Sequence, residues 1–166
     1  MPMFTADLSV ASLDQLLSNV KAYQKKIDEA PEKISVRLAE IGAASISENL
    51  SGITDTDGNV PGTVGIALSG SKATVYQQGD QIAYIEFGTG AQDAASRHPQ
   101  AGEVGWNYDS GTKIHTMKNG KRMWRYWDKL KGHWRITSGL PAQKQVYRAA
   151  LKMRDSIPTV AKEALK

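Results

Sequence analysis

The sequence of 166 residues contains no cysteine and only two phenylalanines. The missing thiols exclude disulfides, zinc–thiolate sites and cysteine nucleophiles. No stretch approaches the roughly 20 apolar residues that a membrane-spanning helix needs. The N-terminus also lacks the basic start and apolar run of a signal peptide. We therefore expect a protein that is made in the cytoplasm and does not enter a membrane.

Core material is scarce as well, because hydrophobic residues make up only 40% of the chain. A chain of this length suits one domain, and a compact fold of this size buries roughly 70% of the surface that the unfolded chain exposes. We expect a single α+β domain over residues 1–166. The modest apolar content further suggests that neighbouring copies complete its burial.

Charge is distributed unevenly along the chain. Residues 1–60 hold five basic and nine acidic side chains, a net charge of −4. Residues 113–135 hold eight basic side chains and one acidic side chain, a net charge of +7. This asymmetry indicates either a nucleic-acid surface or copies that pack acidic face against basic face.

The two ends of the chain predict helices. Ser12 has the character of an N-cap with Gln15 completing a capping box, and Pro31 fits the first turn of a second helix that continues towards Leu50. Two N-terminal helices are therefore expected. Near the C-terminus an apolar seam recurs at steps of three and four residues, which predicts one more helix. The seam consists of Val146, Ala150, Met153, Ile157, Val160 and Ala164.

The middle of the chain predicts an antiparallel, meandering sheet on which the C-terminal helix packs. Alternating residues on both sides of Gly70 and Ser71 predict a first hairpin. A short helix from Ile82 to Glu86, ended by Gly88, is expected to be inserted after it, and a strand is the competing interpretation of this segment.

A second group of strands is predicted further along the chain. Strands near residues 113–118 and 122–128 flank Asn119-Gly120, a pair typical of a type I′ turn. A third strand near residues 132–137 is expected to follow a turn at Lys129-Leu130. Residues 89–112 have little periodicity and predict a long loop.

No motif for catalysis or for a metal is present. The three histidines, His98, His115 and His133, do not have the spacing that places two imidazoles on one helical face. The sequence contains neither a nucleophile elbow nor a phosphate-binding loop. We expect no catalytic residues, no metal and no cofactor.

The basic segment 113–135 allows two interpretations. Trp124, Tyr126, Trp127 and Trp134 interleave with arginines and lysines, a mixture that can stack bases and contact phosphates. The segment would then bind nucleic acid without sequence preference. The interpretation that we favour is a two-sided sheet that buries its aromatic residues and turns its charges outward.

Three segments in a fixed order carry a resemblance to a known family. Residues 83–90 read A-Y-I-E-F-G-T-G, His98-Pro99 and an aromatic sheet segment follow, and residues 139–143 read G-L-P-A-Q. Together they resemble the tail-completion proteins of tailed bacteriophages, also called head–tail joining or neck proteins. The similarity runs from about Ile34 to the C-terminus, and the segment before Ile34 does not align with the family.

The resemblance implies a structural virion protein of the neck, without catalytic activity. Such subunits form a homo-oligomeric ring, a hexamer or a dodecamer, between the head and a long non-contractile tail. Its partners would be a portal-side connector protein and a tail terminator or tail-tube protein. The double-stranded genome would pass through the lumen without sequence-specific binding. The chain would thus be made in the host bacterial cytoplasm and end in the virion.

Two sets of residues follow as candidates. The motif residues expected to anchor the fold are Tyr84, Glu86, Phe87, Gly88, Thr89, Gly90, Pro141, Ala142 and Gln143. The residues expected to contact another subunit or a partner are Glu86, His98, Pro99, Arg122, Arg125, Lys129 and Arg135.

Glu86 is the most informative of these residues. An acid among apolar residues needs a partner. A basic group on the same or a neighbouring subunit, or a role as a helix cap, would satisfy it. The family often has an aromatic residue shortly after P-A-Q, where this chain has Lys144 and Gln145. Val146 or Tyr147 is therefore expected to supply that apolar contact.

Overall fold

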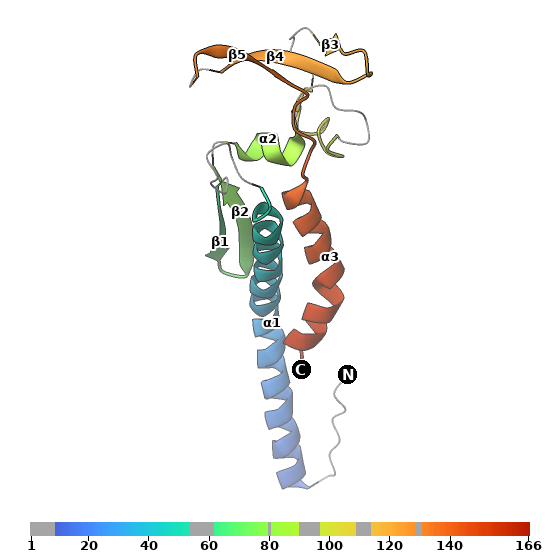
Figure 1. The fold of residues 1–166 in the computed structure, drawn as a ribbon. Coiled ribbons are helices and arrows are strands. Elements are labelled where there is room, and N and C mark those ends of the chain that lie inside the picture. Colours follow the sequence, from blue (N-terminus) through green and yellow to red (C-terminus); the bar gives the residue numbers. More distant parts are fainter. Residues whose placement is uncertain (1–8, 54–61, 80, 90–96, 109–113, 129–130) are drawn as a thin grey trace.

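The computed structural model describes residues 9–53, 62–79, 81–89, 97–108, 114–128 and 131–166 (Figure 1). Its helices and strands form the mixed α+β arrangement that the sequence predicts. In chain order they are α1 (Val10–Leu50), β1 (Thr63–Ser69), β2 (Lys72–Gln78), α2 (Ile82–Phe87), β3 (His115–Thr116), β4 (Arg122–Asp128), β5 (His133–Thr137) and α3 (Gln145–Ala164). Gly90 and the predicted turn at Lys129-Leu130 lie outside the described residues.

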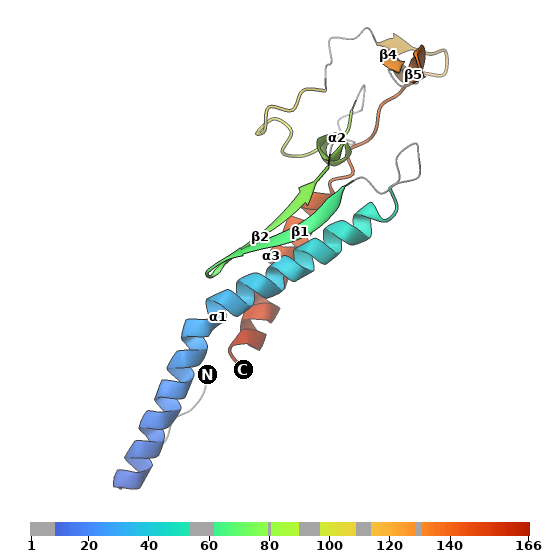
Figure 2. The ribbon, with the colours of Figure 1, turned by 90° about the vertical axis from the view of Figure 1, so that its left-hand side faces the viewer.

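The prediction of two N-terminal helices is wrong, because α1 is continuous through Pro31. An interior proline removes one backbone hydrogen bond and bends a helix, but it need not end it. Here Ala30 is buried, and Glu29 and Lys33 pair across the proline at 2.8 Å. These interactions hold both sides of Pro31 in one helix, and Figure 2 shows that α1 bends part-way along its length.

The N-cap of α1 also differs from the predicted one. The hydroxyl of Ser9 accepts a hydrogen bond from the amide of Ser12 at 3.3 Å, so Ser9 caps the helix three residues before the expected position. None of the helices in the described part of the chain is long and apolar enough to span a membrane.

α3 packs along α1 rather than on a sheet, which corrects the predicted position of the C-terminal helix. The close approach depends on Gly42, where an added Cβ would collide with the sulfur of Met153. The buried centre is small: Ile46, Leu50 and Ala149 form the core cluster, with Ile53, Val64 and Val75 packed against it. The first hairpin and α3 therefore meet at the C-terminal half of α1.

The predicted apolar seam of α3 is only partly correct. Met153, Val160 and Ala164 are buried or half-buried, whereas Val146 and Ile157 are 40% and 45% exposed. The face that packs on α1 is rotated towards Gln145 and Ala149, which are fully or almost fully buried. A small residue at position 149 lets the two helices approach closely, which apolar periodicity alone does not reveal.

The single meandering sheet that we predicted is two separate sheets in the described residues. β1 and β2 pair antiparallel around Gly70 and form the first sheet. β3, β4 and β5 form the second, which lies at the end of the molecule opposite the start of α1 (Figure 1). Among the described residues, Val64 and Val75 of the first sheet pack on the core cluster, and no residue of the second sheet does.

The turn between β3 and β4 is not the predicted type I′ turn. Met117 and Lys121 pair across it, and the amide of Gly120 donates to the carbonyl of Met117 at 2.9 Å. Gly120 has a φ of 79°, whereas Asn119 is not among the residues with positive φ. The loop therefore has three residues, 118–120, which is the common alternative to a two-residue type I′ turn.

The contact at Gly42 generates a stability prediction. Gly42→Leu should lower the free energy of unfolding by about 1–3 kcal/mol, because the new side chain forces α1 and α3 apart. Gly52→Leu is the matched control, since a Cβ at Gly52 meets nothing within 4 Å. Chemical denaturation followed by circular dichroism measures both variants. Equal stability of the two would contradict the tight packing.

Candidate functional site at the start of the C-terminal helix

The segments that carry the family resemblance meet in one place, although they are up to about sixty residues apart in sequence. We call this place the α2–α3 junction; it comprises residues 84–89, 97–108 and 139–147. Backbone hydrogen bonds join its parts. Gln143 and Lys144 donate to the carbonyls of Ile85 and Glu86 at 2.9 and 3.2 Å, and Thr89 donates to the carbonyl of Leu140 at 2.7 Å. The end of α2 is thereby fixed to the segment that leads into α3.

Gly88 is required for this close approach. Its φ is 77°, in the left-handed region that favours glycine. A Cβ at this position would lie 2.6 Å from both the amide nitrogen of Ala142 and the carbonyl oxygen of Leu140. Thr89 completes the contact, since its hydroxyl accepts a hydrogen bond from the amide of Leu140 at 3.0 Å.

Glu86 caps the start of α3 from outside the helix. Its carboxylate accepts hydrogen bonds from the amides of Val146 at 2.8 Å and Tyr147 at 3.0 Å. Lys144, the N-cap residue by position, has a φ of 59° and makes no side-chain cap bond. First-turn amides have no partner within their own helix, and the positive end of the helix dipole favours a carboxylate. Glu86 is only 5% exposed, so it performs this role in a dry environment.

His98 is the third partner of the Glu86 carboxylate. Its Nε2 lies 2.9 Å from Glu86 Oε1, and its Nδ1 accepts a hydrogen bond from the amide of Gln100 at 3.1 Å. A ring nitrogen that accepts from an amide carries no proton, so the proton lies on Nε2 and is donated to Glu86. His98 is 4% exposed. The pair is therefore a buried, directional contact between the loop and the helix cap.

Aromatic residues enclose the Glu86–His98 pair. Phe87 stacks on Trp106 with ring centroids 5.3 Å apart, and the ring of Tyr147 meets that of His98 edge-on at 5.3 Å. The hydroxyl of Tyr108 donates to the carbonyl of Phe87 at 2.6 Å and accepts from the amide of His98 at 2.8 Å. Tyr147 thus supplies the apolar contact that the sequence left open between Val146 and Tyr147.

The remaining motif residues have smaller roles. Tyr84 is 54% exposed and packs edge-on against Trp106 at 5.6 Å. Pro141 is exposed, and its carbonyl accepts a hydrogen bond from the side chain of Gln143 at 3.3 Å. Gln145, which the sequence analysis did not select, is fully buried and lies 3.5 Å from the side-chain oxygen of Gln77 on β2.

The residues predicted to contact partners fall into four groups. Glu86 and His98 are buried inside the chain and do not present themselves to another subunit, whereas Pro99 is exposed. Arg122 and Arg125 are exposed on opposite faces of β4. Arg135 is bound to Asp128 at 3.2 Å, and Lys129 lies outside the described residues.

The second sheet does not bury all of its aromatic residues, contrary to the interpretation that we favoured. Trp124 and Tyr126 are half-buried on the face that also includes Arg135. On the opposite face Trp127 and Trp134 are 48% and 64% exposed and pack edge-on at 5.6 Å. Ile136, 57% exposed, pairs with Arg125 on that same face. We call these four residues, Arg125, Trp127, Trp134 and Ile136, the sheet patch.

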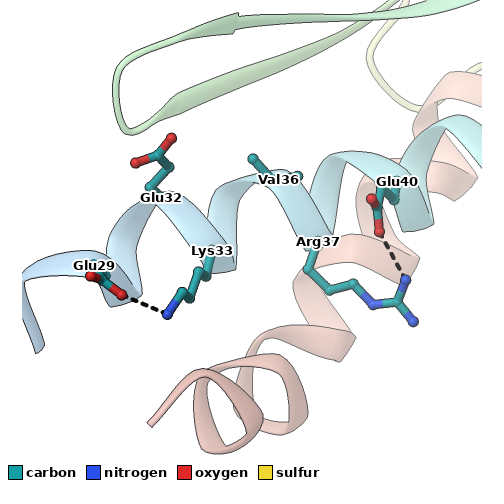
Figure 3. Close-up of a pocket in the computed structure, with 6 residues that line it drawn as sticks. All are labelled: Glu29, Glu32, Lys33, Val36, Arg37 and Glu40. Atoms are coloured by element: carbon teal, nitrogen blue, oxygen red, sulfur yellow. Dashed lines mark hydrogen bonds and ion pairs between the residues drawn. The ribbon is translucent and has the colours of Figure 1, made fainter. Parts of the chain in front are cut away.

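A shallow groove runs along the surface of α1, lined by Glu29, Glu32, Lys33, Val36, Arg37 and Glu40 (Figure 3). Four of its five charged residues are paired within the helix. Lys33 donates to Glu29 at 2.8 Å and lowers the pKa of that carboxyl, and Arg37 donates to Glu40 at 2.8 Å, which raises the pKa of the guanidinium. These pairs follow helical spacing on an exposed face, which is the arrangement of a solvated helix surface.

The histidines do not converge on a common site. His98 is in the α2–α3 junction, His115 is opposite Met123 at one end of β4, and His133 is opposite Asp128 at the other end. Within the described residues no group of three or more histidine, aspartate or glutamate side chains has the geometry to hold a metal ion.

Comparison with known proteins finds no matching family model, no matching curated protein and no matching solved structure.

The cap supplied by Glu86 predicts a large effect of a small substitution. Glu86→Gln places an amide NH2 against backbone N–H donors, so the free energy of unfolding should fall by roughly 2–4 kcal/mol. Glu48→Gln is the matched control, since Glu48 is 79% exposed and lies 3.9 Å from Lys152. The two variants are compared by denaturant titration, in which the circular dichroism of the helices is followed at about 222 nm. A Glu86→Gln variant as stable as the control would refute the capping role.

The geometry of His98 predicts its tautomer. Long-range 1H–15N correlation spectra should show His98 protonated on Nε2 and unprotonated on Nδ1. His133 is an internal comparison, because its Nδ1 lies 3.1 Å from the carbonyl oxygen of Lys131 and should carry the proton there. Finding Nδ1 of His98 protonated would mean that the hydrogen bond with Gln100 is absent.

Proposed function

We propose that this chain is a structural subunit of a phage neck, a tail-completion protein that assembles into a ring. The observation that carries the proposal is the convergence of the resembling segments on the α2–α3 junction. In it Glu86 caps α3, Gly88 permits close backbone contact and His98 fixes the neighbouring loop. All three residues stabilise the fold of the subunit, as is expected of a motif that defines the fold of a family.

The polar groups of the junction are occupied by the fold itself. Both carboxylate oxygens of Glu86 and both ring nitrogens of His98 have partners within the chain. A nucleophile or general base has to reach a substrate, and these groups are buried behind aromatic residues. Their arrangement therefore favours a structural protein over an enzyme.

The surface available to partners lies elsewhere, on the second sheet. The sheet patch exposes two tryptophans and an isoleucine beside Arg125. Exposed apolar patches of this kind mark protein contacts, and tryptophan and arginine are the residues that most often dominate binding energy. We propose that the sheet patch contacts a neighbouring subunit, the portal-side connector or the tail protein. The genome would pass through the lumen without being bound tightly.

The ring is tested with purified protein and with a pair of variants. We expect the wild-type chain to form ring-shaped oligomers by negative-stain electron microscopy and sedimentation velocity, alone or after mixing with the connector and tail-terminator proteins of the same phage. Trp127→Ser/Trp134→Ser should abolish the rings while leaving the circular dichroism spectrum unchanged, because it removes the contact and not the core.

Leu68→Ser is the control for that experiment, since Leu68 is 61% exposed at the tip of the first hairpin. It should leave the rings intact. A wild-type chain that stays monomeric with and without these proteins, together with virions that lack the chain, would refute the proposed function.

A second candidate function is supported by the exposure of Trp127 and Trp134. Exposed indoles beside Arg125 can stack on bases, and each stacked base contributes about 1–3 kcal/mol. A nucleic-acid binder should bind fluorescein-labelled single-stranded and duplex oligonucleotides with an affinity that falls steeply with salt. Binding lost in Trp127→Ser/Trp134→Ser but kept in Leu68→Ser would favour this function. No binding at low salt would eliminate it.

A further inference from the structure

The N-terminal part of α1 extends beyond the other described residues (Figure 2). We call residues 10–28 the α1 arm. None of these residues is buried, and the first buried residue of α1 is Ala30, at 5% exposure. α3 ends beside the base of the arm, where the side chain of Lys26 donates to the carbonyl of Lys166 at 2.9 Å. From there to Val10 the arm is helical without a covering element among the described residues.

One side of the arm is apolar and exposed. Its exposed apolar residues are Val10, Leu13, Leu17, Val20 and Ile27, with exposed fractions of 76%, 46%, 53%, 42% and 46%. Their steps of three, four, three and seven residues keep a heptad pattern, in which only Gln24 interrupts the series. This is the a/d spacing with which one helix packs into another.

The opposite side of the arm is polar. Gln15 donates to Asn19 at 3.1 Å, and Lys25 lies 3.8 Å from Glu29, both at a spacing of four residues. The arm is therefore amphipathic. A helix of this length gains little stability in water from its own backbone, and most helices are stabilised by packing of their apolar side. The arm thus needs a partner for the exposed apolar side.

We propose that the partner is the arm of a second copy of this chain, packed antiparallel. In that arrangement Leu17 packs against the partner's Val20 and Leu13 against the partner's Gln24. Because the contact has two-fold symmetry, each of these pairs occurs twice. Val10 and Ile27 form the outer pairs in the same way.

The residues that flank the apolar side select the antiparallel orientation. Asp14 and Lys21 lie on one flank, and antiparallel packing places Asp14 across from the partner's Lys21 twice. Leu16 and Tyr23 lie on the other flank and meet in the same way. In a parallel pair, Lys21 would instead face the partner's Leu16, and Asp14 the partner's Ser9. Charge complementarity and apolar contact therefore agree on one orientation.

This contact is separate from the ring that we propose as the function. Subunits of a cyclic ring all point the same way, whereas a two-fold contact joins two subunits of opposite polarity and closes on itself. An arm-paired dimer would be a form of the protein outside the ring. Loss of the dimer would not affect the ring proposal, and failure of the ring would not affect the dimer.

The absence of cysteine allows a direct test of orientation. Leu13→Cys and Gln24→Cys are made separately in the full chain and oxidised alone and as a mixture. Antiparallel packing predicts covalent dimers in the mixture and very few in either variant alone. Efficient cross-linking of Leu13→Cys with itself would mean parallel packing and would overturn the proposal.

The dimer itself is tested by sedimentation equilibrium. We expect the Trp127→Ser/Trp134→Ser variant, which forms no rings, to reach twice the chain mass of 18.1 kDa at tens of micromolar concentration. In that background Leu17→Glu should be monomeric, whereas Ala22→Glu, which adds the same residue to the polar side of the arm, should still dimerise. Asp14→Lys should weaken the dimer several-fold, and Asp14→Lys/Lys21→Asp should restore it, because the charges are exchanged.

Hydrogen exchange separates the other outcomes. If the Trp127→Ser/Trp134→Ser variant is monomeric and its arm amides are nevertheless protected, another part of the same chain covers the apolar side. A monomer with rapidly exchanging arm amides would mean that a second copy does not cover it at all. Either result overturns the proposal.

Discussion

The carboxylate of Glu86 holds together parts of the chain that have little else to join them. It accepts hydrogen bonds from two first-turn amides of α3 and one from His98, and it does so at 5% exposure. Hydrogen bonds to a charged group contribute roughly 1.5–3 kcal/mol each, more than neutral ones. A buried carboxylate without such donors would be strongly unfavourable. The start of α3, the loop around His98 and the end of α2 are consequently fixed as one unit.

The polar junction is important for the fold because the apolar core is small. Three residues form the buried cluster, and the second sheet lies away from it. With so little apolar area buried, directional contacts have to define where α3 begins and how it leaves the sheet. The αL conformation of Lys144 and the positive φ of Gly88 lie on either side of this contact. The hydrogen bond from the amide of Lys144 to the carbonyl of Glu86 offsets part of the cost of the left-handed conformation at Lys144.

The first hairpin and the end of α2 followed from the sequence, whereas the N-cap of α1, the type of the β3–β4 turn and the long-range packing did not. Alternation around Gly70 predicted the first hairpin, and Gly88 predicted the end of α2, because both depend on neighbouring residues. The helix break that we predicted at Pro31 is wrong, because the effect of the proline depends on the packing of Ala30, which the sequence does not show. For Glu86, the sequence limited the options to a basic partner or a helix cap, and the structure contains both His98 and the cap. We did not select Trp106 and Tyr108 from the sequence, although they are two aromatic residues in an otherwise polar, glycine-rich loop.

The two ends of the molecule expose different kinds of surface, and this difference bears on assembly. The sheet patch combines tryptophan, isoleucine and Arg125, whereas the α1 arm carries aliphatic residues at heptad spacing. A self-complementary helix seam suits a two-fold contact, and an irregular aromatic patch suits an unlike surface. The whole arm lies before Ile34, outside the part of the chain in which the sequence carries the resemblance. A contact made by the arm would thus be additional to the contact that we propose for the sheet patch.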